Sequence, residues 1–189
     1  MSVQNGFLAL LTLGPAYGSQ LQSDFLARAA HRRSLNAGQV YSTLDRMVDQ
    51  GLVESAGATE DGLPLYSLTS PGADRARAWL TRGPRDARPD WDELQDRVLI
   101  AASLPDTDVL AVLADYRASF TEAIRELSHD ADSRAALAAN RAAELGARAA
   151  LEWIDEVTAA LIAHPDALLQ HRLLERPRRG RRPAVRDET

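Results

Sequence analysis

Residues 38–55, GQVYSTLDRMVDQGLVES, contain three structural signals in one short run. Apolar residues recur there at helical spacing and predict a helix with one buried side. That side consists of Val40, Leu44, Met47 and Val48. Asn36, just upstream, is a favourable N-cap, and Gly51 supplies the residue beyond the helix C-terminus. Residues 52–55 then read as a short strand, so the run predicts a helix that leads directly into a sheet.

Two further helices are expected upstream of this run. Residues 7–13 are almost entirely apolar and end at Gly14-Pro15, a strong helix stop. A second set of apolar residues follows at helical spacing, namely Leu21, Phe25, Leu26 and Ala29. The run is therefore preceded by two helices and forms the third.

A hairpin and a fourth helix are expected downstream. The polar, Gly-bearing residues 57–62 separate the strand at 52–55 from a second strand at 65–68. Ser70-Pro71 reads as an N-cap followed by proline at the first helical position. The order helix, helix, helix, hairpin, helix is typical of a winged helix-turn-helix.

The second half of the chain predicts long helices. Asp90 and Glu93 form a capping-box pattern after a linker at residues 83–90, and Pro105 interrupts the helix that they begin. The next helix repeats apolar residues at alternating four- and three-residue spacing, and a final helix spans about residues 133–162. Because each of these helices has one apolar stripe, we expect them to pack on each other or on another subunit. The residues predicted to mediate dimerisation are Leu113, Tyr116, Phe120, Ile124, Leu127, Ile154 and Leu161.

The expected fold class is mainly α, with a small β-hairpin wing. Residues 1–85 are predicted to form a winged helix-turn-helix DNA-binding domain, and residues 86–169 a helical dimerisation domain. Residues 170–189 are predicted to be an Arg-rich, disordered tail.

Composition and charge narrow the function classes. The chain has no cysteine, and its histidines are scattered without metal-ligand spacing, so we expect no metal site, no cofactor and no enzyme. No apolar run is long enough for a membrane span, and a cytoplasmic protein is expected. The net charge of −5 is unevenly distributed: +1 over residues 1–85, −10 over 86–169 and +4 over 170–189. The acidic residues are therefore concentrated away from the predicted DNA-binding domain.

The third helix has the residue types that read double-stranded DNA. Glutamine can pair with adenine and arginine with guanine or a phosphate, and a recognition helix presents such groups near its N-terminus. An arginine cluster just before the helix suits backbone contacts, although any solvated helix face can show the same residue types. The predicted DNA-binding residues are Arg28, Arg32, Arg33, Asn36, Gln39, Tyr41, Ser42, Thr43 and Arg46.

Three stretches, FLALLTLGPAYGSQL, GQVYSTLDRMVDQGLVES and LPLYSLTSPG, resemble the PadR family of transcriptional regulators. The resemblance covers residues 5–82, and residues 90–162 look like the helical C-terminal region of the branch with the larger dimerisation domain. It implies a ligand-responsive repressor that acts as a homodimer. The wing departs from the family pattern, because its tip is Thr59-Glu60-Asp61 where the family often has Arg or Lys.

Three tryptophans are candidates for an effector site. Trp79, Trp91 and Trp153 lie in or beside the predicted joint between the two regions, where a small apolar or aromatic effector could stack on them. Core packing is the favoured interpretation for Trp79 and Trp153, so Trp91 is the main candidate.

Two alternatives remain open at this stage. The Arg-rich tail could contact the DNA backbone or could be a solvated charge run; its residues are Arg176, Arg178, Arg179, Arg181 and Arg182. The acidic wing also leaves room for a protein-interaction module built on the acidic helices, without strong DNA binding.

Overall fold

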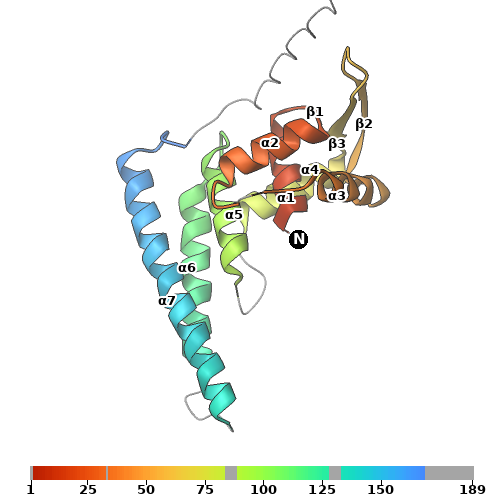
Figure 1. Cartoon of the computed structure of the whole chain (residues 1–189). Coiled ribbons are helices and arrows are strands. Elements are labelled where there is room, and N and C mark those ends of the chain that lie inside the picture. The colour runs from red at the N-terminus through yellow and green to blue at the C-terminus, as the bar shows by residue number, and fades with distance from the viewer. Residues whose placement is uncertain (1, 33, 84–88, 128–132, 169–189) are drawn as a thin grey trace, which may run out of the picture.

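The computed structural model describes residues 2–32, 34–83, 89–127 and 133–168 (Figure 1). Its first half contains α1 (Ser2–Leu10), the 3-10 helix η1 (Leu11–Leu13), β1 (Ala16–Tyr17), α2 (Gly18–Arg28), α3 (Ala37–Asp49), β2 (Val53–Ala58), β3 (Pro64–Leu68) and α4 (Ser70–Thr81). Its second half contains α5 (Trp91–Ala102), α6 (Val109–Glu126) and α7 (Arg134–Ala163). The predicted fold class and the predicted order of helices and hairpin are confirmed. None of the described helices combines the length and hydrophobicity that a membrane crossing requires.

The sheet has three antiparallel strands in the order β1-β3-β2. β2 and β3 form the predicted hairpin, with Val53 opposite Leu68, and project from the helices as the wing (Figure 1). β1 was not predicted; it pairs Ala16 with Tyr66 at the base of the wing. Two residues are too few to show a strand periodicity, so β1 depends on its partner strand and has no signal of its own.

Side-chain caps begin the helices close to where the sequence indicates. Asn36 Oδ1 accepts a hydrogen bond from the Gln39 backbone N–H at 2.7 Å, and Asp90 Oδ1 accepts one from Glu93 N–H at 2.8 Å. The prediction that Ser70 caps α4 is wrong by one residue. Thr69 is the N-cap: its hydroxyl accepts from the Gly72 N–H and donates to the Gly51 carbonyl, which also ties α4 to the end of α3.

Two hydrophobic clusters make up the interior, and α5 contributes to both. Ile100, Ala101 and Leu104 pack with α1, α2 and α3 in the cluster beneath the winged domain. Leu94 and Val98 pack instead with α6 and α7. The region around α5 is therefore continuous with both halves of the molecule. The predicted domain boundary at residue 85 falls in residues 84–88, outside the described residues.

α6 and α7 lie side by side and extend away from the winged domain (Figure 1). Within the chain this contact buries most of the residues that we expected between subunits. Five are at most 6% exposed, namely Leu113, Tyr116, Phe120, Ile154 and Leu161, whereas Ile124 and Leu127 are half-buried. The predicted seam is thus an intramolecular core, because two successive helices satisfy each other's apolar stripes before a second subunit is needed.

Candidate nucleic-acid interface

The outer face of α3 presents polar side chains to solvent. Asn36, Gln39, Ser42 and Arg46 are all exposed, and so is Tyr41. Arg46 folds back along its own helix, where its Nε donates to the Ser42 carbonyl at 3.0 Å. Asn36 and Gln39 lie at the N-terminus of the helix, where free backbone N–H groups also favour a phosphate, and Arg46 lies in its last turn. The face can therefore donate and accept hydrogen bonds over about two helical turns.

Two residues of α3 lie on the opposite side from the one predicted. Thr43 is 3% exposed, so the prediction that it contacts DNA directly is wrong; its hydroxyl accepts from Arg46 Nη2 at 3.3 Å instead. Val48, predicted to be buried, is 44% exposed. The buried stripe is thus Val40, Thr43, Leu44 and Met47, and Thr43 acts as a support for Arg46.

Tyr41 packs closely over the start of α2. A Cβ at Gly18 would lie 2.9 Å from the Tyr41 Cε1 atom and 3.3 Å from Leu44 Cδ1. Since such a contact is too short for an ordinary Cβ, Gly18 leaves the space in which the Tyr41 ring rests. The ring therefore links the N-terminus of α2 to the exposed face of α3.

Arg28 and Arg32 of the predicted arginine cluster are held by contacts within the protein. Arg28 is 4% exposed and donates to the Ser103 carbonyl and hydroxyl at 2.9 and 2.8 Å, with Asp24 at 3.6 Å. Burial lowers the pKa of Arg28 below its usual range, although the nearby Asp24 opposes that shift. Arg32 is bound to Asp96, and Arg33 lies outside the described residues. The prediction for Arg28 is wrong, because it connects α2 to the end of α5.

Acidic side chains border the exposed face of α3. Asp45 and Asp49 are exposed on the same helix, and Glu60 and Asp61 are exposed at the tip of the wing. The tip is a closed turn in which the Gly62 N–H donates to the Thr59 carbonyl at 2.8 Å. These carboxylates would repel phosphates that approach them.

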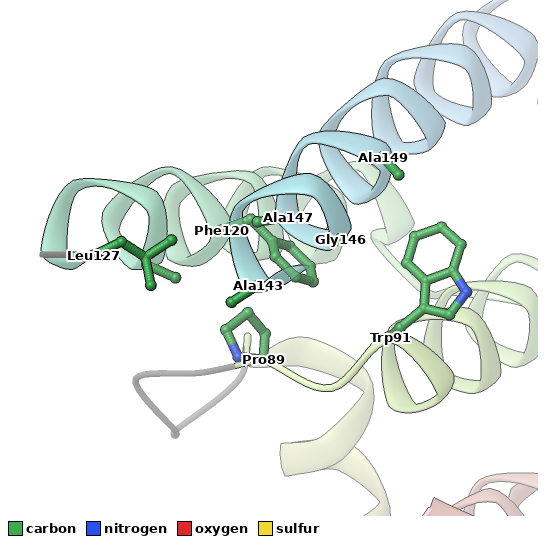
Figure 2. Close-up of a pocket in the computed structure, with 9 residues that line it drawn as sticks. Pro89, Trp91, Phe120, Leu127, Ala143, Gly146, Ala147 and Ala149 are labelled. Carbon is green, nitrogen blue, oxygen red and sulfur yellow. The ribbon is translucent and has the colours of Figure 1, made fainter. Parts of the chain in front are cut away.

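A pocket of about 470 Å³ lies between the start of α5, α6 and α7. Figure 2 shows Pro89 and Trp91 facing the small residues of α7 across this pocket. Its lining is almost entirely apolar: Pro89, Trp91, Phe120, Ala123, Leu127, Ala143, Gly146, Ala147 and Ala149. Such a site suits a flat apolar molecule.

The three tryptophans divide between two places. Trp91 lines the pocket and meets Trp153 edge to face, with ring centroids 5.7 Å apart. Trp79 is 5% exposed in the cluster beneath the winged domain, with the Arg97 guanidinium 5.3 Å from its ring centroid. The structure thus brings Trp91 and Trp153 together and leaves Trp79 in a core.

Comparison with known proteins identifies the N-terminal half. Residues 7–78 match the model of the transcriptional regulator PadR-like family. The resemblance expected from the motifs is confirmed for residues 7–78, which include α3.

Several solved structures are similar to the chain. Bacillus subtilis PadR in complex with operator DNA shares 17% identity at a TM-score of 0.42, covering 85% of this chain and 99% of that one. The same protein in complex with p-coumaric acid shares 17% identity at a TM-score of 0.38, covering 85% and 96%. The PadR-like regulator BC1756 from Bacillus cereus shares 14% identity at a TM-score of 0.36, covering 85% and 98%. The comparison with curated proteins gives no match.

Sequence reasoning missed how the PadR-like domain is attached to the rest of the chain. Asp96 and Arg97 of α5 bind Arg32 and the Arg82 carbonyl, and Ser103, the C-cap of α5, binds Arg28. These partners are 15 to 75 residues apart in the chain, so no local pattern could have predicted them. The sequence held one indication of these contacts: Asp96 lies four residues before Ile100, on a buried side of α5, where a carboxylate needs a partner.

Proposed function

We propose that this protein is a sequence-specific, double-stranded DNA-binding transcriptional regulator that reads base edges with α3. The observation that carries the proposal is the exposed row of Gln39, Ser42 and Arg46 on a helix whose N-terminus is fixed by the Asn36 cap. Gln39 suits adenine, and Arg46 suits guanine once it leaves the Ser42 carbonyl. The match of residues 7–78 to the PadR-like family model supports the same role.

The acidic residues around α3 set the expected character of binding. Asp45, Asp49 and the wing tip reduce the number of phosphates that the domain can neutralise. Non-specific binding depends almost wholly on such charge neutralisation, whereas base contacts by α3 do not. We therefore expect modest affinity for random duplexes and a pronounced preference for the cognate site.

A homodimeric repressor is the form that the family resemblance implies. Because the α6–α7 seam is intramolecular, a subunit contact would use the outer surface of the helical region. Large apolar side chains are exposed along α7, namely Leu137, Leu145 and Ile162. A charged residue at one of these three positions should therefore weaken a dimer.

Fluorescence anisotropy tests the DNA-binding proposal. Duplexes selected from a random library by the wild-type protein are compared with scrambled duplexes at two salt concentrations. The double substitution Gln39→Ala and Arg46→Ala should weaken binding to the selected duplex by about 30-fold or more, since each base contact contributes about 1–3 kcal/mol. Binding to the scrambled duplex should change much less.

A charge-matched control separates base reading from net charge. Arg125→Ala removes one positive charge from the exposed end of α6, away from the winged domain, and should leave both affinities nearly unchanged. Equal losses on both duplexes in the double variant would show that α3 does not read bases. Failure of the wild type to enrich any duplex would favour the protein-interaction module instead.

We also propose that the pocket beside Trp91 binds a small apolar or aromatic effector. The apolar lining and the Trp91–Trp153 pair support this proposal. Titration with 1-anilinonaphthalene-8-sulfonate, followed by tryptophan quenching, provides a direct test. Ala143→Phe should fill the pocket and abolish the quenching, whereas Ala142→Phe, exposed next to it and outside the lining, should not. Unchanged quenching in Ala143→Phe would place the probe elsewhere.

A further inference from the structure

A buried carboxylate joins α5 to the segment that leads into α3. The Asp96 side chain is fully buried, and its two oxygens accept hydrogen bonds from Arg32, from Nε at 3.1 Å and from Nη2 at 2.8 Å. His31 Nε2 lies 3.2 Å from the same carboxylate. Asp92, one turn earlier on α5, adds a longer contact of 3.5 Å to Arg32. Two successive residues after α2 are therefore held by one side chain of α5.

The bound segment is the one that places the recognition helix. Arg32 is four residues before Asn36, whose side chain caps α3. Gln22 of α2 supports the intervening chain by donating to the Leu35 carbonyl. Asp96 therefore anchors, from α5, the connection that leads into α3, while Leu35 anchors the same connection in the core.

α5 is itself fixed on its other side. Leu94 and Val98 are fully buried against α6 and α7, and α5 lies between the winged domain and the α6–α7 pair (Figure 1). A second connection, from Arg28 to Ser103, anchors the far end of α5 to α2. α5 therefore helps to set the orientation of α3 relative to the α6–α7 pair, together with α4, which contacts α6 directly.

The Asp96–Arg32 pair is better suited to fixing the orientation of the attached segment than to raising the free energy of unfolding. Burial raises the pKa of Asp96 in spite of its cationic neighbours, whereas the hydrogen bond to Asp96 raises the pKa of Arg32. Desolvation dominates at Asp96 because that carboxylate is fully enclosed, while Arg32 keeps partial access to water. Apolar residues in such a place often give equal or greater stability, but a two-point guanidinium–carboxylate contact fixes direction.

We propose that Asp96 is a positioning residue for DNA recognition, which through Arg32 sets the angle of α3 and hence the half-site spacing that the dimer accepts. The proposal rests on the proposed function, since it requires a homodimer that reads DNA with α3. In a two-fold dimer, the distance between recognition helices must match the helical repeat of the duplex. A rigid connection enforces one spacing, and a loosened one tolerates several.

Half-site spacing provides the test. Duplexes selected by the wild-type protein are altered by inserting one or two base pairs between the half-sites, and dissociation constants are measured by anisotropy. The wild type should lose at least about tenfold in affinity per insertion, because the second half-site rotates out of reach. Asp96→Asn should reduce that penalty to about threefold or less, while its affinity for a duplex with a single half-site stays within about twofold of wild type.

Two further variants separate positioning from folding and charge. Arg32→Lys keeps the charge but loses the two-point contact, so it should also relax the spacing preference, and it serves if Asp96→Asn does not fold. Asp92→Asn removes the longer, exposed contact and should leave the preference close to wild type. The two relaxed variants should melt as single transitions with wild-type helical content by circular dichroism.

The outcomes distinguish this inference from the proposed function. A wild-type penalty that persists unchanged in folded Asp96→Asn and Arg32→Lys would overturn the positioning role and leave DNA recognition intact. A wild type that accepts every spacing would also overturn it. If the wild type selects no duplex at all, the proposed function fails, and the positioning role fails with it.

Discussion

Replacing Ile154 by alanine tests whether the α6–α7 contact is an intramolecular core. The side chain is 1% exposed and packs in the cluster formed by α5, α6 and α7. The substitution removes three carbon atoms from the interior, which at about 0.8 kcal/mol each gives about 2.4 kcal/mol. The cavity left behind raises the expected loss to about 3–4 kcal/mol. Ile162→Ala is the matched control, since the same residue type on the same helix is 65% exposed; it should cost under about 1 kcal/mol.

Urea unfolding, followed by circular dichroism at one fixed protein concentration, measures both losses in the free energy of unfolding. Light scattering measures the mass of each folded variant. We expect Ile154→Ala to have a much lower unfolding midpoint and an unchanged mass. A halved mass for Ile154→Ala, with little loss of stability in the dissociated chain, would show that this side chain lies between subunits. Equal stability losses in the two variants would refute the burial argument itself.

Two further predictions concern Gly72 and Asp96. A Cβ at Gly72 would lie 1.9 Å from the Leu52 carbonyl oxygen, which accepts from Thr69 N–H. Gly72→Ala should therefore lower the free energy of unfolding by about 1–3 kcal/mol or more. Gly146→Ala, with open space around it in α7, should raise it by about 0.5–1 kcal/mol; reversed signs in urea unfolding would contradict the packing. Because burial raises the pKa of Asp96, the folded state takes up this proton before the unfolded chain does. The stability that Asp96 contributes is thus largest in acid and is lost as pH rises through the raised pKa. The free energy of unfolding of wild type, minus that of Asp96→Asn, should increase as pH falls from neutrality towards about 4, and a difference independent of pH would contradict this assignment.

Much of the fold could be predicted because its signals are local. The Asn36 and Asp90 caps act within three residues of themselves, and both form the expected backbone hydrogen bonds. The wing hairpin follows from the polar, Gly-bearing residues 57–62 between two short strand-like stretches. The exposed row of α3 follows from a 3.6-residue repeat. That repeat also places Thr43 on the buried side, three residues after Val40 and four before Met47, so its burial could have been predicted.

The remaining features depend on partners that are distant in sequence. Arg28 and Arg32 are close in the chain and look like one basic patch, but each binds a group of α5 that is 64 or more residues away. A periodic apolar stripe likewise indicates that a helix packs against another element, but it does not identify that element. Phe120 of α6 and Ile154 of α7 pack in the same cluster within one chain. Charge and periodicity read along the sequence therefore identify the elements, whereas the contacts between elements decide which side chains remain free for function.

The position of α5 explains why the linker does not separate two independently packed domains. The composition changes at residues 83–90, yet Ile100, Ala101 and Leu104 complete the core beneath the winged domain. The same helix presents Trp91 to the pocket and, five residues later, Asp96 to Arg32. Because a helix of three turns moves as one body, a molecule that displaces Trp91 would also displace Asp96. The proposed effector site and the proposed DNA-reading helix are thus connected by one short, rigid element, and the polar contacts at its winged side are where their coupling would be lost.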